Sequence, residues 1–460
     1  MINEEIKKIH FIGILGSGIS FAASLAKLQG YQVSGCDHAS TSEFKKELDD
    51  LNINVSNSED KNHLEGIDLI VISPAIKKFN PNHAELVEAK EKSITVLTWQ
   101  EFVGQYLLKD KFVIAIAGTH GKGTTTAIVG LIMEELGLDP TVGIGAIVPK
   151  WGTNYRFGRS KYFVIEADEF NDNFLNYSSD LIGITNIEMD HPEYFQNLHD
   201  LMDSFSKFVA KKNPKVILNK DNELSAQLAD RINEENVIWY SSKDASASFY
   251  LEKIVSDEEG IKFKEGKSLR LFVSNLHGGH NAINALCALS VIFSLVPATT
   301  EDTNVANKVL ESFSGLKRRF EIMQNSAGIT IVDDYAHHPT AIRETLKTAK
   351  QVFPDKKIWG VFQPHMYTRT KYLFDDFVKV FKQNLIDELI VTDIYAAREK
   401  DPGIVSSKDL VTETSSDSVK YIRSLDEVTQ YLKKNVGKDD VVVIMGAGDV
   451  NRVTKELLNG

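Results

Sequence analysis

The 460-residue chain has little cysteine, no excess of positive charge and no long apolar run, and each shortage excludes a class of protein. Only Cys36 and Cys287 are present, which excludes a disulfide framework or a cysteine metal cluster and fits a reducing compartment. A net charge of −12 argues against nucleic acid or an anionic membrane as the main partner. The longest apolar run, near residues 286–296, is too short to span a bilayer, and the N-terminus has no signal-peptide pattern. We therefore expect a cytoplasmic protein without membrane insertion.

The remaining composition, 42% hydrophobic and 25% charged, is typical of a globular protein. At roughly 150 residues each, the length suggests about three domains. Strand-like apolar runs alternate with helical patterns, which predicts an α/β fold of three doubly wound domains. We expect a Rossmann-like domain at 1–107, a central P-loop domain with a parallel sheet and a small antiparallel insertion at 108–315, and a Rossmann-like domain at 316–460.

A glycine-rich loop between a predicted strand and a predicted helix is the strongest functional motif. The apolar run 112–117 stops at Gly118, and apolar residues at helical spacing follow Thr124. In such a loop the backbone N–H groups and the helix N-terminus face the phosphates of a nucleoside triphosphate, and a lysine adds a mobile charge. The predicted nucleotide-binding residues are Gly118, Thr119, His120, Gly121, Lys122, Gly123 and Thr124.

The first segment opens with a strand–helix–strand pattern that looks dinucleotide-binding, although its glycines are not spaced as in the usual fingerprint. Gly16, Ser17 and Gly18 follow the first strand, and Asp37 follows the second, where it could hold a ribose or a base edge. Ser73 opens a predicted loop after a later strand, where a ligand could sit. The alternative is that the glycines serve only close packing of helix on strand.

Acidic residues follow two predicted strands of the middle segment. Glu166, Asp168 and Glu169 follow one strand, and Asp190 and His191 follow the next. The carboxyl ends of parallel strands meet at the edge where α/β sheets bind ligands. Hard divalent cations take oxygen ligands, so the group predicts a metal and phosphate site. Hydrolysis, phosphoryl transfer and ligation remain open on these residues alone.

Two histidine-rich loops follow strands of the last segment. One contains Tyr335 and His337, and the other contains His365 and Arg369. Together they predict a polar pocket of cationic character that would suit a small substrate bearing a carboxylate. The alternative, helix caps and sheet-edge turns, does not explain the clustering of histidine and arginine.

Six motifs, in order along nearly the whole chain, resemble those of the Mur ligases, with the closest similarity to the alanine-adding branch. They are Gly118-Thr-His-Gly-Lys122, Glu166-Ala-Asp-Glu169, Thr185-Asn-Ile-Glu-Met-Asp-His191, Lys317-Arg-Arg-Phe320, Asp333-Asp-Tyr-Ala-His-His-Pro339 and Phe362-Gln-Pro-His-Met-Tyr-Thr-Arg-Thr370. The resemblance implies an ATP-dependent amide-forming ligase of peptidoglycan synthesis. It would use ATP and Mg²⁺ to join a small amino acid, L-alanine expected, to UDP-N-acetylmuramate through an acyl phosphate.

The resemblance also implies a role for each matching residue. The expected catalytic residues are Lys122 on the β- and γ-phosphates, His191, and Arg319 (or Arg318). Magnesium ligands are expected at Thr124, Glu166 and His191. Residues near adenine are expected at His280, Asn281 and Asn284. The UDP-sugar is expected at Gly16, Ser17, Gly18, Asp37 and Ser73. The amino-acid substrate is expected at Tyr335, His337, His365 and Arg369.

Two residues depart from the pattern of the alanine-adding branch. Gly123 replaces the hydroxyl residue that ligates magnesium, with Thr124 as the nearest substitute, and Met366 stands where an arginine is usual. One alternative is a ligase that attaches the whole murein tripeptide, L-Ala-γ-D-Glu-meso-diaminopimelate. A folate ligase shares the Gly-Lys-Gly sequence but should lack a domain such as residues 1–107. A non-catalytic ATP-binding relative is a third alternative.

Overall fold

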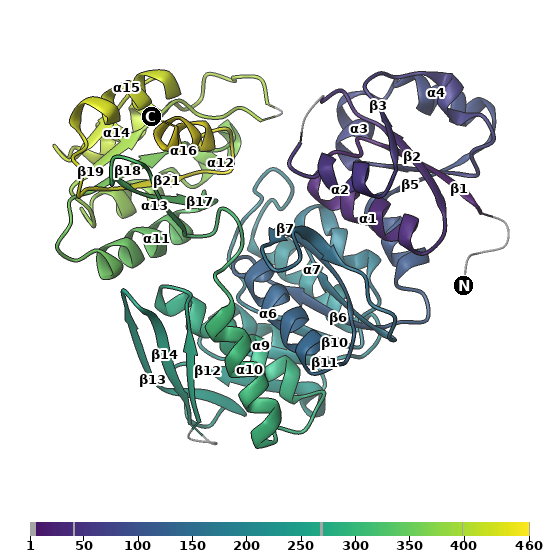
Figure 1. The fold of residues 1–460 in the computed structure, drawn as a ribbon, viewed down its shortest axis with the longest axis horizontal. Coiled ribbons are helices and arrows are strands. Elements are labelled where there is room, and N and C mark those ends of the chain that lie inside the picture. The colour runs from purple at the N-terminus through teal and green to yellow at the C-terminus, as the bar shows by residue number, and fades with distance from the viewer. Residues whose placement is uncertain (1–5, 40–41, 267–269, 398, 460) are drawn as a thin grey trace. The chain divides into compact units, whose positions relative to one another are not determined.

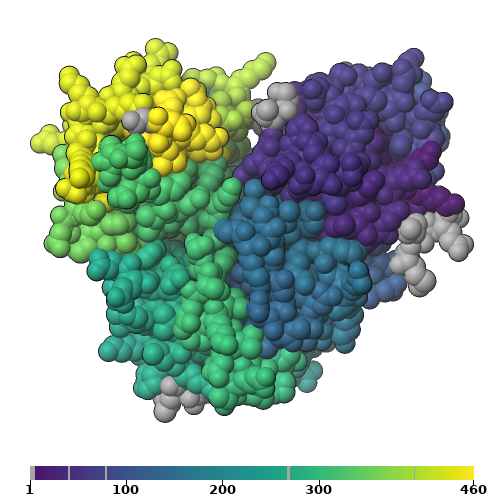
Figure 2. Space-filling model, in the orientation of Figure 1, coloured from purple at the N-terminus to yellow at the C-terminus, as the bar shows by residue number. Residues whose placement is uncertain are grey.

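The computed structural model describes residues 6–39, 42–266, 270–397 and 399–459. Two compact units make up the chain, and Figures 1 and 2 show their ribbon and their space-filling surface. The first unit comprises Met1–Ile187, Met202–Tyr240 and Cys287–Ala306. The second comprises Glu188–Leu201, Ser241–Leu286 and Asn307–Gly460. Their strands build the mostly parallel sheets that the sequence predicts.

The N-terminal sheet of the first unit is parallel, in the order β3-β2-β1-β4-β5. Its strands are β1 (Lys8–Ile12), β2 (Gln32–Cys36), β3 (Asn54–Ser56), β4 (Leu69–Ile72) and β5 (Thr95–Thr98). The helical elements are α1 (Ser17–Leu28), α2 (Lys45–Asp50), η1 (Lys61–Leu64), α3 (Pro74–Phe79), α4 (Ala84–Glu91), α5 (Trp99–Phe102) and η2 (Val103–Leu107). The strand order reverses between β1 and β4, which is where α/β sheets bind ligands.

The central sheet of the first unit runs β12-β11-β10-β6-β9-β7-β8. Its strands are β6 (Phe112–Ala117), β7 (Thr141–Val148), β8 (Thr153–Arg156), β9 (Tyr162–Glu166), β10 (Leu181–Ile184), β11 (Lys215–Asn219) and β12 (Val237–Ser241). Strands β7 and β8 pair antiparallel, whereas the other pairs are parallel. The helical elements of this region are α6 (Lys122–Glu135), η3 (Phe170–Asn176), α7 (Leu198–Ala210), α8 (Glu223–Ala229) and η4 (Glu234–Asn236).

The second unit contains the predicted antiparallel insertion and the C-terminal sheet. The insertion is the meander β13 (Phe249–Asp257), β14 (Gly260–Glu265) and β15 (Arg270–Ser274). The C-terminal sheet runs β16-β17-β21-β18-β19-β20. Its strands are β16 (Glu321–Gln324), β17 (Thr330–Asp334), β18 (Ile358–Phe362), β19 (Glu388–Val391), β20 (Val419–Tyr421) and β21 (Val441–Met445). Only β16 is antiparallel among the pairs described in this sheet.

Alternating side chains of the C-terminal strands fill two separate cores. Val332 and Val443 belong to one cluster, and their neighbours Ile331 and Val442 belong to the other. Helices α11 (Pro339–Val352) and α13 (Phe374–Phe381) contribute to the first cluster, and α15 (Leu425–Asn435) and α16 (Asn451–Leu458) to the second. The remaining helices are α9 (Gly279–Phe293), α10 (Thr300–Ser312), α12 (Tyr367–Tyr372) and α14 (Ser407–Thr414). Helices on both faces make this a doubly wound sheet.

One local prediction is wrong. The stretch after β4, expected to be a loop, forms helix α3 with Ser73 at its N-cap and Pro74 in its first turn. Proline is well suited to that position, because its fixed φ matches the helix and its missing N–H would be unpaired there in any case. In the part of the chain that the structure describes, no helix is both long and apolar enough to cross a membrane.

Candidate functional site

The glycine-rich loop between β6 and α6 is held by the segment that follows β10. The backbone N–H of His120 donates to Asn186 Oδ1 (3.0 Å), and its carbonyl accepts from Asn186 Nδ2 (2.9 Å) and Thr185 Oγ1 (2.6 Å). Gly118 has a φ of +124°, and a β-carbon there would lie 2.3 Å from Thr185 Oγ1. The loop therefore requires glycine at position 118, and the Thr185-Asn186 pair fixes its shape.

Lys122 opens helix α6, and its ammonium is paired within the first unit. Its Nζ lies 2.7 Å from Glu169 Oε2 and 3.6 Å from Asp168 Oδ1. Burial alone would lower the pKa of Lys122, but the charges of Glu169 and Asp168 outweigh burial and raise that pKa. The lysine is thus fully charged and held by carboxylates, so a bound phosphate would have to replace one of these partners.

The two predicted magnesium ligands of the first unit both offer oxygen. Glu166 ends β9, and its Oε2 accepts a hydrogen bond from Gly145 N at 2.6 Å. Thr124 lies half-buried in the first turn of α6. Oxygen donors beside the glycine-rich loop fit a hard cation such as Mg²⁺. His191 belongs to the second unit, so an ion shared between Glu166 and His191 stays a prediction.

The residues expected near UDP gather around the start of α1. Gly16 is the N-cap of α1, and a β-carbon on Gly18 would lie 2.3 Å from the Trp99 ring, so close packing accounts for this second glycine. Asp37 accepts from Leu15 N and from Ala39 N, each at 2.9 Å, and therefore braces the loop before α1.

Two more of these residues line the same loop region of the first unit. A β-carbon on Gly13, whose φ is +78°, would lie 3.2 Å from Ser73 Cβ, so Ser73 faces the loop before α1. Ser17 is the first residue of α1, and its carbonyl accepts from Asn154 Nδ2 at 2.7 Å. The loop therefore has neighbours in both sheets of the first unit.

The residues expected near adenine start helix α9 and are linked to one another. Asn281 Nδ2 donates to His277 O (2.9 Å), and Asn284 Nδ2 donates to Asn281 Oδ1 (3.0 Å). Gly278, with a φ of +84°, precedes the helix, and Asn281 N donates to its carbonyl at 2.9 Å. His280 lies in the first turn of the same helix. The two amides are therefore oriented before any ligand arrives, while their contact with adenine stays a prediction.

Adjacent arginines before β16 differ in how firmly they are held. Arg318 Nη2 donates to Gly446 O (2.8 Å), and its Nε lies 3.4 Å from Asp333 Oδ1. Arg319 is exposed and makes no ion pair with any residue that the structure describes, although its guanidinium lies 5.1 Å from the centre of the Tyr335 ring. Of the two arginines, Arg319 is thus the one available to reach a phosphate.

Arg369, which lies in α12, is buried in a charged network of the second unit. Its Nε lies 3.2 Å from Asp190 Oδ1, and its Nη2 lies 3.6 Å from Glu193 Oε1 and 2.9 Å from His191 Nδ1. Burial would raise the pKa of Asp190, but the charges of His191 and Arg369 hold it well below its usual range. The guanidinium therefore ties down the segment that carries His191. The sequence motifs include Asp190 but gave no reason to single out Glu193.

Tyr335, His337 and His365 lie together, as the sequence predicts. The rings of Tyr335 and His337 are centred 5.5 Å apart, and those of His337 and His365 are 6.0 Å apart. His365 stacks on Tyr395 at 5.7 Å. Burial, followed by the charge of Arg369, lowers the pKa of His337 well below its usual value, so this ring is neutral at pH 7.

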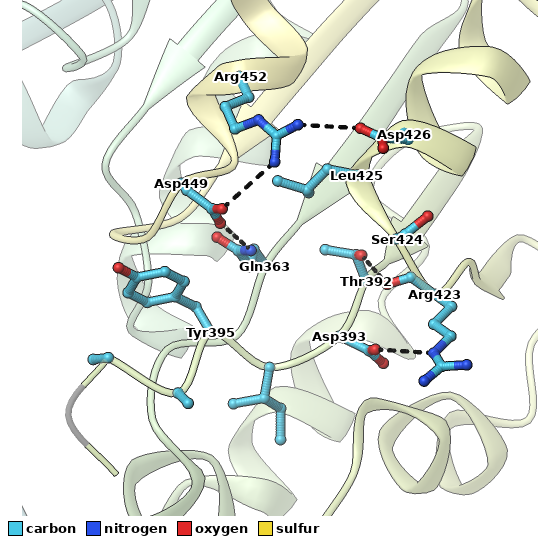
Figure 3. A pocket seen from close by; sticks show the side chains of 13 residues that line it. Gln363, Thr392, Asp393, Tyr395, Arg423, Ser424, Leu425, Asp426, Asp449 and Arg452 are labelled. Atoms are coloured by element: carbon cyan, nitrogen blue, oxygen red, sulfur yellow. Dashed lines mark hydrogen bonds and ion pairs between the residues drawn. The ribbon is translucent and has the colours of Figure 1, made fainter. Parts of the chain in front are cut away.

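A surface pocket at the carboxyl edge of the C-terminal sheet contains residues that no sequence motif indicated (Figure 3). Arg452 pairs with Asp426 at 3.2 Å, and Arg423 pairs with Asp393 at 3.7 Å. Tyr395, the stacking partner of His365, also lines it. The available signal in the sequence was the glycine-rich loop after the last strand, whose Asp449 accepts from Gln363 Nε2 at 2.8 Å.

Three family profiles match the chain in succession. Residues 8–111 match "Mur ligase family, catalytic domain", residues 116–292 match "Mur ligase middle domain", and residues 318–448 match "Mur ligase, glutamate ligase domain".

Full-length relatives and solved structures agree with these matches. A UDP-N-acetylmuramate–L-alanine ligase of Caldicellulosiruptor saccharolyticus is 38% identical, over 99% of both chains. One of Caldanaerobacter subterraneus subsp. tengcongensis is 37% identical, over 99% of this chain and 98% of its own. The crystal structure of a UDP-N-acetylmuramate–alanine ligase from Thermotoga maritima is 27% identical and has a TM-score of 0.81, covering 98% of each chain. A murein peptide ligase from Psychrobacter arcticus, at 23% identity and a TM-score of 0.71, shares the fold.

Proposed function

Because this chain belongs to the Mur ligase family, we propose that it uses ATP to join L-alanine to UDP-N-acetylmuramate in peptidoglycan precursor synthesis. The observation that carries the proposal is the likeness to three relatives named UDP-N-acetylmuramate–L-alanine ligase, which are 36–38% identical over 99% of this chain. The six ordered motifs, one of which is the glycine-rich loop of the first unit, support the same reaction. The proposed activity is therefore that of an amide-forming ligase.

The chemistry follows from the low reactivity of a carboxylate toward an amine. A muramate carboxylate oxygen attacks the γ-phosphorus of ATP and ADP leaves, which gives an acyl phosphate. The amine of L-alanine then attacks the acyl carbon, phosphate leaves, and the amine loses a proton. Lys122, already charged at the mouth of the glycine loop, would exchange a carboxylate for the transferring phosphoryl group and stabilise its charge.

Mg²⁺ would be held by Glu166 and Thr124, with His191 as a further proposed ligand, and would neutralise charge on the phosphates. The backbone amides of the loop at Gly121 and Lys122 would orient the phosphates. Arg319, exposed and unpaired among the described residues, would add a second cation to the transferred group. Each of these residues binds or orients, so positioning and charge stabilisation supply the rate enhancement.

The amino acid is the least constrained substrate. Neutral His337, together with His365 and Tyr335, offers hydrogen bonds close to the Arg369 network. The pocket that Tyr395 and Arg423 line is adjacent to His365 through the stacked Tyr395 ring. We propose that the L-alanine carboxylate is bound in this region. A ligase acting on the whole murein tripeptide is the alternative outcome of the test.

The test is phosphate release by the full-length protein with ATP, Mg²⁺ and UDP-N-acetylmuramate. Four reactions are compared, with L-alanine, glycine, the murein tripeptide or no acceptor, and products are identified by mass spectrometry. We expect rapid release with L-alanine and a product heavier by one alanine residue. If only the tripeptide supports phosphate release, the protein is a peptide ligase instead. If no acceptor stimulates phosphate release, it is an ATP-binding protein without ligase activity.

A further inference from the structure

A buried group of nitrogen, sulfur and oxygen donors lies in the N-terminal domain, and none of its members has a role in the proposed reaction. His10 comes from β1, Cys36 from the end of β2, His63 from η1 and Glu85 from α4. One ligand atom from each lies within 4.8 Å of the ligand atoms of the other three. His10, Cys36 and Glu85 are buried, and His63 is partly buried.

Glu85 lies at the centre of this group. Its Oε2 lies 3.1 Å from His10 Nε2 and 3.3 Å from Cys36 Sγ, and its Oε1 lies 2.8 Å from His63 Nδ1. The carboxylate has no solvent exposure. Burial of a carboxylate, two imidazoles and a thiol together carries a desolvation cost, which a cation bound among them would offset.

The His10 ring carries the second indication of a ligand. Its Nδ1 lies 2.9 Å from Ser34 Oγ, which fixes the orientation of the ring. Its buried Nε2 points into the group and finds no hydrogen bond of acceptable geometry among the described residues, despite the short distance to Glu85. A histidine that ligates a metal has this arrangement, with one ring nitrogen held by an outer partner and the other directed at the ion.

We propose that His10, Cys36, His63 and Glu85 form a binding site for a borderline divalent transition metal, with Zn²⁺ as the best match. With bonds of about 2.0–2.3 Å, a tetrahedral zinc ion holds its ligand atoms about 3.5 Å apart. The closest pairs here are already near that spacing, and because no pair is more than 4.8 Å apart, none needs to approach by more than about 1.3 Å. Imidazole and thiolate favour zinc over the hard Mg²⁺ of the ATP reaction.

Binding would replace the hydrogen bonds of the group by metal bonds. Cys36 would lose its thiol proton to solvent and coordinate as the thiolate, with no change in oxidation state. The ion would link the paired strands β1 and β2 to η1 and α4. Because Cys36 O accepts from Gly13 N at 2.8 Å, the link would also stiffen the loop before α1.

A neighbouring triad, His38, Glu59 and His83, offers a contrast within the same domain. Its ligand atoms also lie close together, but there are three of them and His38 is 64% exposed. Glu59 is already bound by Asn80 Nδ2 at 2.7 Å and by Ala84 N at 2.9 Å. The triad lacks a thiol and a buried ring nitrogen without a hydrogen bond, so it serves as the control.

The experiment titrates the chelator-treated full-length protein with Co²⁺ and then displaces the cobalt with Zn²⁺. We expect stoichiometric uptake with a thiolate-to-cobalt charge-transfer band and the visible bands of tetrahedral cobalt. Cys36→Ser should lose the charge-transfer band, and both Cys36→Ser and His63→Gln should weaken Zn²⁺ binding roughly tenfold or more. The controls Cys287→Ser, which removes the other buried cysteine, and His38→Gln should keep the band and the affinity.

A second measurement guards against a variant that simply misfolds. The thermal midpoint of the wild-type protein should rise when Zn²⁺ is restored and fall again with a chelator, whereas in Cys36→Ser the midpoint should not respond to either. The absence of tight Co²⁺ and Zn²⁺ uptake by the wild-type protein would overturn the proposal and leave a hydrogen-bonded polar cluster. So would a charge-transfer band that survives Cys36→Ser, or Zn²⁺ binding that is lost in His38→Gln.

Discussion

Two cations, the partly buried Lys122 of the first unit and the buried Arg369 of the second, are paired in different ways. Lys122 has one buried partner, Glu169, and a more distant one, Asp168, that is 44% exposed. Arg369 lies between Asp190 and Glu193, whose side chains are 9% and 14% exposed. A lysine has a flexible stem and a compact charge, whereas an arginine holds its partners with a rigid planar fork.

This difference separates a cation that can change partners from one that cannot. Lys122 lies beside backbone amides that suit phosphate, and its flexible stem lets the ammonium keep Glu169 while a phosphoryl oxygen replaces the exposed Asp168. Moving Arg369 toward a substrate would leave the buried charges of Asp190 and Glu193 uncompensated. We therefore expect Lys122 to act on the reacting phosphates and Arg369 chiefly to position the segment that carries His191. The role of Arg369 in binding the amino-acid carboxylate stays a prediction.

The largest expected effect is that of Lys122→Ala on ligation. Removing the cation that stabilises the transferring phosphoryl should cost on the order of 4 kcal/mol or more, at least a thousandfold in kcat/KM. Phosphate release measures the loss, and far-ultraviolet circular dichroism checks that the fold is intact. Lys150→Ala, which removes an exposed lysine paired with Glu134 and Glu135, is the control and should retain activity. Near wild-type turnover in Lys122→Ala would exclude Lys122 from the chemistry.

Arg369→Ala should have the largest effect on stability. Two buried carboxylates would lose their cation, which we expect to lower the free energy of unfolding of the second unit by about 3 to 4 kcal/mol. Urea denaturation measures this change. The control is Arg452→Ala, because its pair with Asp426 is exposed and should contribute about 1 kcal/mol or less. If Arg369→Ala and Arg452→Ala lower the free energy of unfolding equally, Arg369 does not stabilise the fold, and its role in the site is limited to binding the substrate.

The family and the fold class predicted from the sequence are confirmed. Both could be predicted because apolar runs and loop motifs report local structure directly. The pairing of charges was not predictable. The sequence places Lys122 and Glu169 at neighbouring strand ends but does not say that they touch, and nothing marked Glu193 as a partner of Arg369. The domain boundaries and the roles of the site residues stay predictions.

The donor group around Glu85 was missed for a further reason. The cysteine count excludes a cluster built from cysteines, but a mixed site needs only one. Its members are spread over residues 10–85 on four elements, so no local spacing reveals them. The order of the parallel strands and the positions of η1 and α4 bring them together.

A third prediction compares Asp190, whose neighbouring charges outweigh its burial, with Asp334, whose burial outweighs its neighbouring charge. Burial raises the pKa of Asp334 from 3.8 to about 6, although Arg319 opposes the shift. Because its pKa is raised in the folded state, the protonated Asp334 carboxyl stabilises the fold below about pH 4. This stabilisation is lost as the pH rises to about 6. Two pKa units correspond to about 3 kcal/mol at most.

The measurement is the free energy of unfolding of the wild type and Asp334→Asn between pH 4 and 7. The difference between the two proteins isolates Asp334, because other titrating groups contribute equally to both. Between pH 4 and 7, the free energy of unfolding of the wild type should decline by about 2 kcal/mol more than that of Asp334→Asn. At pH 4 the variant should be slightly less stable than the wild type, because one of the two amides bound by Asp334 loses its acceptor. Asp190, with its lowered pKa, acts in the opposite direction, and the stability it contributes is lost as pH falls below about 4. If the free energy of unfolding has the same pH dependence in the wild type and the variant, ionisation of the Asp334 carboxyl does not lower the stability of the fold.

The smallest expected effect tests whether a free cation beside Arg369 improves amino-acid binding. Met366 precedes α12 with a φ of +69°, and its backbone N–H donates to Tyr395 O at 2.9 Å, so the residue lies beside the pocket that Tyr395 lines. An arginine there would have the same backbone strain as methionine and, unlike Arg369, no buried carboxylate to hold it. A partly exposed arginine–carboxylate pair contributes about 0.7 kcal/mol, so Met366→Arg should lower the KM for L-alanine roughly threefold with kcat little changed. Met366→Leu, which alters the shape without adding charge, should leave KM as it is. A KM for L-alanine that does not fall in Met366→Arg, or falls equally in Met366→Leu, would place the carboxylate away from this loop and return Arg369 to consideration as its partner.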